Sequence, residues 1–427
     1  MHLLYVEQRE MIRKIKEAYE DKNLFIRTLD LAAVMPGVKE TIAAVKNRGD
    51  AALLEYTEKF DHVKLKEIEV MREEVEAAKE SVDEDMMRCI EEAAMAIRNF
   101  HYRQKKRAWV EEFSEGVFLG EKYVPFDVVG AYVPGSYFSS ALMCVIPAKI
   151  AGVREIVVCT PPRKDGDADP LTLVAANLAG ATRICKAGGA QAIAALAFGT
   201  ESIPRVQKIV GPGNVYVTAA KMAVHEEGVE IDFPAGPSEV LIIGDETANP
   251  SFIAADMLAQ AEHGEKSQAV LLTDSARIAA DVEREIVAAA GEESRSPQHW
   301  ILIGESIDEC IECANKYAPE HLEVIVRAPM DVLKRIKNAG SVFVGDYSPV
   351  AAGDYATGAN HVLPTAGYAK LFSGLDVDHF MHRITLQWLD KDGLEKIKEV
   401  VVRSSKAEGM EEHAQSVEKR FLPDSSD

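Results

Sequence analysis

Two short segments of this 427-residue sequence place a histidine beside an amide or a carboxylate. Gln260 and His263 lie three residues apart at the end of an expected helix, so they share one face and could hold one metal ion. Glu320 and His321 are adjacent on an expected turn after Pro319, where an imidazole that titrates at roughly pH 6.5 and a carboxylate could form an acid/base pair. Each pattern also fits plain structure, namely a histidine at a helix C-terminus and a surface turn.

Two later segments add candidate groups. Asp354 and His361 lie within residues 353–364, a stretch of small and polar residues that we expect to form a loop after a strand. Glu408 and His413 flank a glycine near the C-terminus. Two imidazoles, one carboxylate and one amide oxygen suit zinc, cobalt or manganese, and this set is supplied by Gln260, His263, Asp354 and His413. Because the four come from three distant segments, the residues alone leave the metal site a hypothesis.

The elements that must position these residues alternate between strands and helices from about residue 127 onward. Short apolar runs predict strands at 128–133, 155–159, 183–185, 208–210, 239–243, 269–272, 301–303, 324–326 and 341–344. Most are followed by a turn and a helical segment, which argues for parallel α/β structure in two halves that meet near residues 237–238. The first hundred residues are expected to be mostly helical, with helix formers over 8–22 and 72–104.

Glycine-rich turns follow two of the expected strands, at residues 188–189 and 211–213. Each turn precedes a helix whose N-terminal N–H groups could receive a phosphate. The G-x-G-x-x-G pattern of dinucleotide-binding folds follows none of the strands. Since such turns are common in α/β proteins, each alone is a weak sign of a nucleotide site.

Composition excludes several classes of protein. With 48 Lys and Arg against 69 Asp and Glu, the net charge is −21, which disfavours binding to nucleic acid or to anionic membranes. There is no signal-peptide pattern at the start and no apolar run of the roughly 18–20 residues that a membrane helix needs. Six cysteines are too few for a disulfide scaffold, so we expect a cytoplasmic protein. Cys310 and Cys313 fit two cysteines on a helix face better than a redox or metal pair.

Ordered motifs along the chain resemble those of the histidinol dehydrogenase family, from about residue 30 to residue 420. The matching stretches are 187–201, 210–214, 232–240, the segment of Gln260 and His263, 319–322, 353–355 with 360–364, and 408–420. The resemblance implies a cytoplasmic homodimer that uses NAD and one zinc ion per subunit. It would oxidise L-histidinol through L-histidinaldehyde to L-histidine, the last steps of histidine biosynthesis.

The resemblance also implies roles for individual residues. His321 would take the alcohol proton, and Glu320 would activate water for attack on the aldehyde. The implied zinc ligands are Gln260, His263, Asp354 and His413. The implied substrate contacts are Ser238, Gln260, His263, His321, Asp354, Glu408 and His413, with His361 in the same pocket. Glu408 and His413 would be supplied to the site of the partner subunit. The implied NAD contacts are Tyr132, Gln191 and Asn214.

The fold implied by the resemblance has two incomplete Rossmann-like α/β domains with small helical N- and C-terminal extensions, in an aldehyde-dehydrogenase-like arrangement. The expected divisions are a helical arm at 1–28, a substrate and zinc domain at 29–130 and 239–376, an NAD domain at 131–238, and a C-terminal extension for exchange between subunits at 377–427. Residues 132–143 form a stretch shorter than is usual in the family, with Gly135-Ser136 in place of a double glycine.

Three alternatives stay open at this point. A relative on the same scaffold could oxidise another small polar alcohol. Cys159, at the end of an expected strand, could be the nucleophile for an aldehyde step, although a packed thiol fits that position better. An acidic metal-storage or scaffold protein would explain the charge but not the ordered motifs.

Overall fold

The computed structural model describes residues 11–20, 27, 30–264, 266–291 and 299–422. The chain forms two compact units: the first contains residues 1–104 and 126–380, and the second contains residues 105–125 and 381–427. None of the helices built by the described residues has both the length and the apolar character that crossing a membrane requires.

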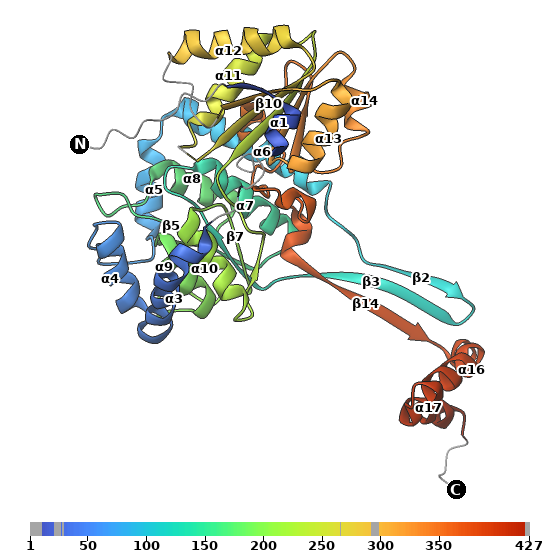
Figure 1. Ribbon diagram of the computed structural model, residues 1–427. Helices are drawn as coiled ribbons and strands as arrows, with labels where there is room; N and C mark the ends of the chain where they lie inside the picture. Colours follow the sequence, from blue (N-terminus) through green and yellow to red (C-terminus); the bar gives the residue numbers. More distant parts are fainter. Residues whose placement is uncertain (1–10, 21–26, 28–29, 265, 292–298, 423–427) are drawn as a thin grey trace. The chain divides into compact units, whose positions relative to one another are not determined.

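A five-stranded parallel sheet organises one half of the first unit (Figure 1). Its strands are β4 (Val128–Tyr132), β5 (Glu155–Thr160), β6 (Arg183–Lys186), β7 (Lys208–Val210) and β8 (Glu230–Ile231). They lie in the order β6-β5-β4-β7-β8, so the strand order reverses between β4 and β7, as in Rossmann-type sheets. The helices between these strands are α7 (Phe138–Ala151), α8 (Pro170–Ala179), α9 (Gly189–Phe198) and α10 (Val215–His225).

The N-terminal helices belong to this five-stranded half. They are α3 (Leu31–Arg48), α4 (Asp50–Phe60), α5 (Arg72–Ser81) and α6 (Glu84–Tyr102). Helices α3 and α4 share a core with α9 and α10, while α5 and α6 pack on α7 and α8. We expected residues 29–130 to belong with residues 239–376, whereas these helices pack on the five-stranded half. Their apolar faces meet those of α7–α10, a contact that local periodicity could not reveal. The expected helix at 72–104 is interrupted where Asp83 caps α6.

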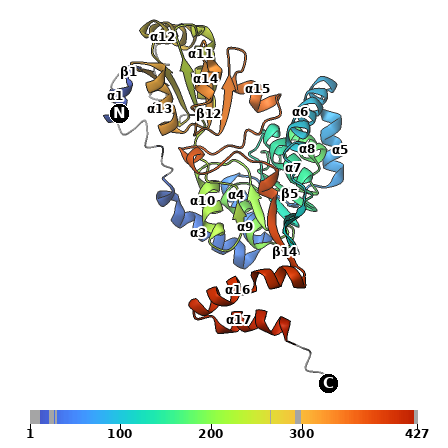
Figure 2. The ribbon, with the colours of Figure 1, turned by 90° about the vertical axis from the view of Figure 1, so that its right-hand side faces the viewer.

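A six-stranded parallel sheet organises the other half (Figure 2). Its strands are β1 (Ile12–Lys14), β9 (Glu239–Gly244), β10 (Gln268–Thr273), β11 (His299–Ile303), β12 (His321–Ile325) and β13 (Ser341–Val344), in the order β1-β11-β10-β9-β12-β13. Apart from β1, this order repeats that of the five-stranded sheet. Strand β1 pairs with β11 at one edge, so part of the arm expected to be helical is a strand, followed by α1 (Ile15–Glu20).

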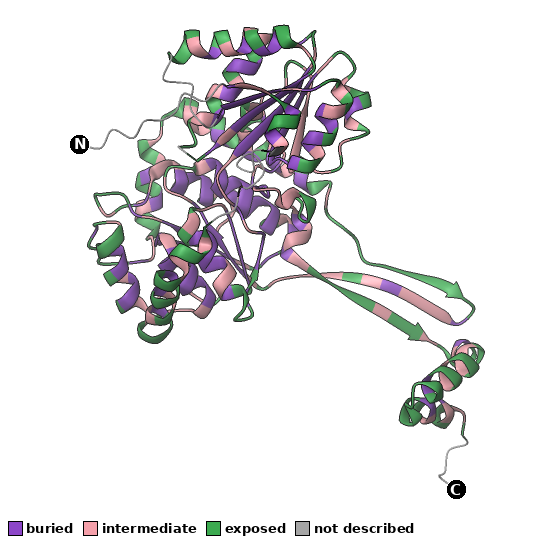
Figure 3. Cartoon of the chain, viewed as in Figure 1, coloured by how far each residue is buried: buried purple, intermediate pink, exposed green. Residues whose placement is uncertain are grey.

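Helices cover both faces of the six-stranded sheet. Helices α11 (Pro250–Ala261) and α12 (Ala276–Ala290) pack on one face, and α13 (Ile307–Tyr317) and α14 (Pro329–Leu333) pack with α1 on the other. Successive strand residues alternate between these faces: Leu241 and Ile243 lie toward α13, and Val240 and Ile242 lie toward α11. The central strands β9 and β12 are therefore buried along their whole length, as Figure 3 shows, and most of their residues are apolar. Short helix α15 (Val350–Tyr355) follows β13.

The second unit has a sheet and helices of its own. Strands β2 (Trp109–Ser114), β3 (Val117–Pro125) and β14 (Met381–Leu389) form an antiparallel sheet in the order β14-β3-β2. Helices α16 (Lys391–Ala407) and α17 (Glu411–Glu418) pack on each other. The predicted C-terminal extension is thus only partly helical, because β14 pairs with β3, which lies between Val117 and Pro125 in the chain.

Candidate functional site

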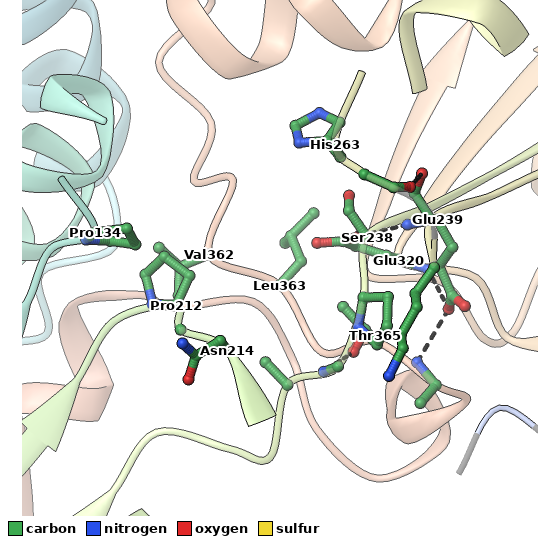
Figure 4. A pocket seen from close by; sticks show the side chains of 18 of the residues that line it. Pro134, Pro212, Asn214, Ser238, Glu239, His263, Glu320, Val362, Leu363 and Thr365 are labelled. Atoms are coloured by element: carbon green, nitrogen blue, oxygen red, sulfur yellow. Dashed lines mark hydrogen bonds between the residues drawn. The ribbon is translucent and has the colours of Figure 1, made fainter. Parts of the chain in front are cut away.

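A cavity of about 1070 Å³ lies in the first unit between the two parallel sheets. One wall comes from the carboxyl ends of β4 and β7, with Pro134 and the turn at residues 211–214. The opposite wall comes from the amino ends of β9 and β12, with Ser238 and Glu320. Figure 4 shows Pro212 and Asn214 on one side and Ser238, Glu320 and His263 on the other. The two sheets therefore present opposite edges to one cavity.

Glu320 is held at the amino end of β12 by hydrogen bonds to β9. Its Oε2 accepts from the Ser238 hydroxyl at 2.8 Å and from the Glu239 N–H at 2.9 Å. Burial raises the pKa of Glu320 well above that of an ordinary carboxyl, while these two donors oppose the shift. The side chain is 7% exposed and lines the cavity, so its position suits a buried base with a raised pKa.

His321 opens β12 and is oriented by the backbone of β9. Its Nδ1 lies 3.2 Å from the Glu239 carbonyl oxygen, so Nδ1–H donates there and Nε2 keeps its lone pair. Nε2 has no hydrogen-bond partner among the described residues and lies 3.9 Å from Asp354 Oδ1. Burial lowers the pKa of His321, with the Asp354 carboxylate acting in the opposite direction. The ring is thus available as a proton acceptor.

The expected turn at Glu320 and His321 is wrong in its detail. His321 pairs in register with Val240 and Ser341 as the first residue of a central strand, and only Glu320 lies before the strand. Both side chains still line the cavity, because the chain bends at Glu320 before it enters the sheet.

Asp354 and His361 meet beside His321. Asp354 lies in α15 rather than in the expected loop, since Pro349 is the N-cap of a short helix that begins at Val350. His361 Nδ1 lies 3.2 Å from the Asp354 carbonyl oxygen and 3.8 Å from its Oδ1. The other ring nitrogen of His361 lies 3.3 Å from the Ser140 hydroxyl, which brings α7 to the same place. Burial lowers the pKa of His361.

Gln260 and His263 lie at the end of α11, as predicted. His263 follows the helix, is exposed and lines the cavity. Gln260 is 4% exposed and does not line the cavity, and its amide nitrogen lacks a hydrogen-bond partner in the described part of the chain. A buried amide nitrogen without an acceptor is costly. Within the described residues, no three His, Cys, Asp or Glu side chains gather closely enough to hold a metal ion.

The turn after β7 is fixed by a buried ion pair. Asp232 and Lys221 pair with each other; the Gly211 N–H donates to Asp232 at 2.8 Å, and Lys221 donates to the Gly211 carbonyl oxygen at 3.0 Å. Gly211 has a φ of +114°, and a Cβ there would lie 2.1 Å from the Tyr132 carbonyl oxygen. Asn214 then caps α10 by accepting from the Tyr216 and Val217 N–H groups at 3.0 and 3.2 Å.

The other two predicted NAD contacts are buried. Tyr132 is 5% exposed, and its hydroxyl accepts from the Gly189 N–H at 3.2 Å. Gln191 is 2% exposed in α9. Of the three predicted contacts, Asn214 lines the cavity, while Tyr132 and Gln191 do not.

The two predicted C-terminal residues belong to the second unit. Glu408 follows α16, and His413 lies in α17. Both side chains are exposed.

Sequence reasoning missed the role of Glu239. Its buried carboxylate pairs with Arg27 and accepts the Glu320 N–H at 3.3 Å and the Ala366 N–H at 3.1 Å. Arg27 in turn stacks on the Tyr317 ring at 3.6 Å. The available signal was a glutamate at the head of an otherwise apolar strand, since a buried carboxylate requires partners.

The cysteines take no part in the cavity. All six are free, and Cys310 and Cys313 lie buried in α13, which confirms the prediction of two helix-face cysteines. Cys159 is fully buried beside Cys185, and this neighbour together with burial raises its pKa well above that of an ordinary thiol. A thiol so placed is a poor nucleophile.

Comparisons with known proteins agree on one family. The family model described as histidinol dehydrogenase matches residues 26–421. The histidinol dehydrogenase of Methanosarcina mazei is 50% identical over 413 residues, covering 94% of this chain and 95% of that protein. The histidinol dehydrogenase of Archaeoglobus fulgidus is 48% identical, covering 92% and 97%.

Two solved structures are also similar to this chain. The crystal structure of histidinol dehydrogenase from Elizabethkingia anophelis has a TM-score of 0.91 and 41% identity, covering 96% of this chain and 97% of that chain. The methylmalonate-semialdehyde dehydrogenase of Oceanimonas doudoroffii has a TM-score of 0.50 at 12% identity, covering 83% and 91%, which shows a shared fold. The fold is therefore the predicted α/β, aldehyde-dehydrogenase-like arrangement, and the chain belongs to the histidinol dehydrogenase family.

Proposed function

We propose that this protein oxidises L-histidinol through L-histidinaldehyde to L-histidine with NAD⁺ as the hydride acceptor. Its relatives carry the name of this activity. One observation carries the proposal: His321 and Glu320 lie on the same wall of the cavity. The opposite wall contains the glycine turn that precedes α10. One wall thus offers two proton acceptors, and the other offers backbone N–H groups.

His321 is the base for the alcohol. Its Nδ1–H is held by the Glu239 carbonyl oxygen, so the proton of the substrate hydroxyl passes to Nε2. Burial keeps the imidazole neutral near pH 7, because it lowers the pKa of His321 from the ordinary histidine value of about 6.5. Asp354 lies 3.9 Å from Nε2 and stabilises the imidazolium that results.

Glu320 is the base for the second oxidation. Its carboxylate would take a proton from the water that attacks the aldehyde carbon. The Ser238 hydroxyl and the Glu239 N–H both bind Oε2, which leaves Oε1 to face the water. A raised pKa makes this carboxyl a stronger base than an exposed glutamate.

The NAD⁺ side of the proposal rests on the wall formed by the five-stranded sheet. Cofactors of Rossmann-like sheets bind where the strand order reverses, here between β4 and β7. The N-terminus of α10 would face the pyrophosphate, with Asn214 at its cap. Tyr132 and Gln191 remain proposed contacts, and Tyr132 supports the start of α9 through Gly189.

The donors of this chain fit a zinc ion. Gln260 could offer its amide oxygen from the end of α11, His263 lines the cavity, and Asp354 lies beside two imidazoles. We propose these three residues as zinc ligands. The first unit supplies only one imidazole and one carboxylate to this set, His263 and Asp354, so we propose that His413 of a second copy is the fourth ligand. Bound zinc would hold and orient the imidazole and amine of the substrate.

We further propose a cytoplasmic homodimer in which His413 and Glu408 complete the site of the partner, with Glu408, Ser238 and His361 contacting substrate. Exposure of His413 and Glu408 supports this exchange, and six free cysteines support a reducing compartment.

The test is the amount of NADH formed per L-histidinol, with and without a chelator. We expect two NADH per substrate, lost on chelation and restored by zinc. Turnover of another small amino alcohol in preference to L-histidinol would instead favour a relative with a different substrate, and activity that survives complete removal of zinc would overturn the metal's role.

A further inference from the structure

Two carboxyl groups face each other inside the six-stranded half. Glu323 lies in the middle of β12 and is 1% exposed. Its side chain lies on the face of the sheet toward α11, since Leu322 and Val324 pack on the opposite face. There it faces the carboxyl group of Asp256, which lies in α11 and is partly buried.

Ordinary donors do not account for this contact. Glu323 Oε1 accepts from the Val350 N–H at 3.0 Å, but Oε2 meets no N–H or O–H group among the described residues. Neither carboxyl forms an ion pair with any described lysine, arginine or histidine. A hydrogen bond between two carboxyl groups requires that one of them keeps its proton.

The proton belongs on Glu323. Burial, followed by the neighbouring Asp256, raises the pKa of Glu323 to about 9. Burial also raises the pKa of Asp256, but its hydrogen bond from Glu323 stabilises the ionised form. Two buried like charges in contact would repel, so the protonated form of the deeper group removes that cost.

The pair joins three elements that each carry a residue of the proposed site. Asp256 precedes Gln260 by four residues, one helical turn, in α11. Glu323 follows His321 by two residues and therefore lies on the same face of β12. Val350, whose N–H is bound by Glu323, starts α15 and precedes Asp354 by one turn.

We infer that Asp256 and Glu323 share one proton and act as positioning residues, which hold α11, β12 and α15 so that Gln260, His321 and Asp354 meet in one site. The shared proton does not depend on the proposed function, whereas the positioning of a metal ligand rests on it. A hydrogen bond between the two carboxyl groups fixes the direction in which the side chains meet, which an apolar contact at the same place would not do.

Infrared difference spectroscopy tests the shared proton without any turnover. The spectrum of the wild-type protein minus that of Glu323→Gln should contain the carbonyl stretch of a protonated carboxylic acid at neutral pH. The matched control is Asp281→Asn, which removes a carboxylate of the surface helix α12 that pairs with Arg277 and Arg284. Its difference spectrum should lack that band, and absence of the band for Glu323→Gln would overturn the shared proton.

Zinc affinity of the full chain tests the positioning. Glu323→Gln keeps a donor toward Asp256 and an acceptor for Val350, so we expect zinc binding close to wild type. Glu323→Leu and Asp256→Ala remove the hydrogen bond and should weaken zinc about 10- to 100-fold. Asp256→Ala keeps the test available if Glu323→Leu does not fold. Wild-type affinity in the disruptive variants would overturn the positioning.

Failure of the proposed function gives a different pattern. A wild-type protein that binds no zinc or does not oxidise L-histidinol refutes that function. The pair would then be judged by the infrared band and by crystal structures of the disruptive variants, in which the distance from His321 Nε2 to Asp354 Oδ1 should exceed 3.9 Å. An unchanged distance would overturn the positioning in that case as well.

Discussion

The two parallel sheets share a strand order and use opposite edges. In the five-stranded sheet, the cavity lies at the carboxyl ends of β4 and β7, where the order reverses and α10 begins. In the six-stranded sheet, it lies at the amino ends of β9 and β12. The first edge offers backbone N–H groups, which suit an anionic cofactor, and the second offers side chains, which suit acid/base chemistry.

The unused carboxyl edge of the six-stranded sheet shows why the difference arises. Asp245, directly after β9, accepts from the Thr247 N–H at 2.9 Å and from the Arg327 N–H at 2.8 Å. A resident carboxylate thus takes the N–H groups that a phosphate would need. In the five-stranded sheet, β7 is the counterpart of β12, and it continues into Gly211 and the capped helix α10. Both edges therefore bind some of their N–H groups internally, and the edge of the five-stranded sheet is the one that lines the cavity.

The largest effect is expected at the catalytic edge. His321→Asn removes the proton acceptor and should lower kcat about 10²- to 10⁴-fold, with KM for NAD⁺ nearly unchanged. Steady-state kinetics measure both constants, and circular dichroism checks the fold. A KM for NAD⁺ that rises as much as kcat falls would contradict the separation of the two edges.

The pH profile of histidinol oxidation should reflect the same residue. Protonation of His321 removes the base, so activity falls as pH falls through its pKa, which burial has moved below its ordinary value near roughly 6.5. The acid limb of kcat/KM should lie below that pH and should be lost in His321→Asn. An acid limb that stays in the variant would assign it to another group.

Glu320→Gln separates the two oxidations. The amide keeps a hydrogen bond to Ser238 but cannot take a proton from water, so aldehyde oxidation should fall about 10²-fold or more while histidinol oxidation is less affected. Each oxidation is measured with its own substrate. Equal losses in both steps would contradict a separate role for Glu320.

A smaller effect is expected at the cofactor edge. Asn214→Ala removes the cap of α10 and should cost about 1 kcal/mol of stability and raise KM for NAD⁺ about 10-fold, at unchanged kcat. The matched control is Asn249→Ala, because Asn249 caps α11 at the unused edge by accepting from the Ser251 N–H. It should lose similar stability and keep its KM. A similar rise in KM for both variants would mean that the caps act only through stability.

The smallest effect is expected for Cys159→Ser. The thiol is fully buried and its raised pKa makes it a poor nucleophile. The rates of both oxidations should therefore stay within about twofold of wild type. Selective loss of aldehyde oxidation would instead restore the cysteine mechanism.

Local patterns in the sequence predicted most strands of the two parallel sheets and both glycine turns, but not β1, β8 or the antiparallel sheet. β4, β7 and β13 end at or within a residue of the expected limits, because apolar runs bounded by turns depend on neighbouring residues only. The partner of helices α3–α6 and the pairing of β14 with β3 were missed, since both depend on contacts between distant segments. His321 was placed in a turn because Pro319 marked a break, whereas pairing with Val240 extends the strand back to it.

The site was predictable only in part for the same reason. Histidines and carboxylates were visible as residue types, and the family motifs ordered them. The supporting groups were not visible: Glu239, Asp232 and Lys221 act through partners that the fold brings to them. Burial, which sets the opposite pKa shifts of Glu320 and His321, is likewise a property of the packed structure.

A crystal structure of the zinc-loaded protein with NAD⁺ and L-histidinol tests the use of opposite edges most directly. We predict the pyrophosphate against the turn at residues 211–214 and the substrate hydroxyl within hydrogen-bond reach of His321 Nε2. A dinucleotide bound instead at the carboxyl edge of the six-stranded sheet, beside Asp245 and Arg327, would contradict the account.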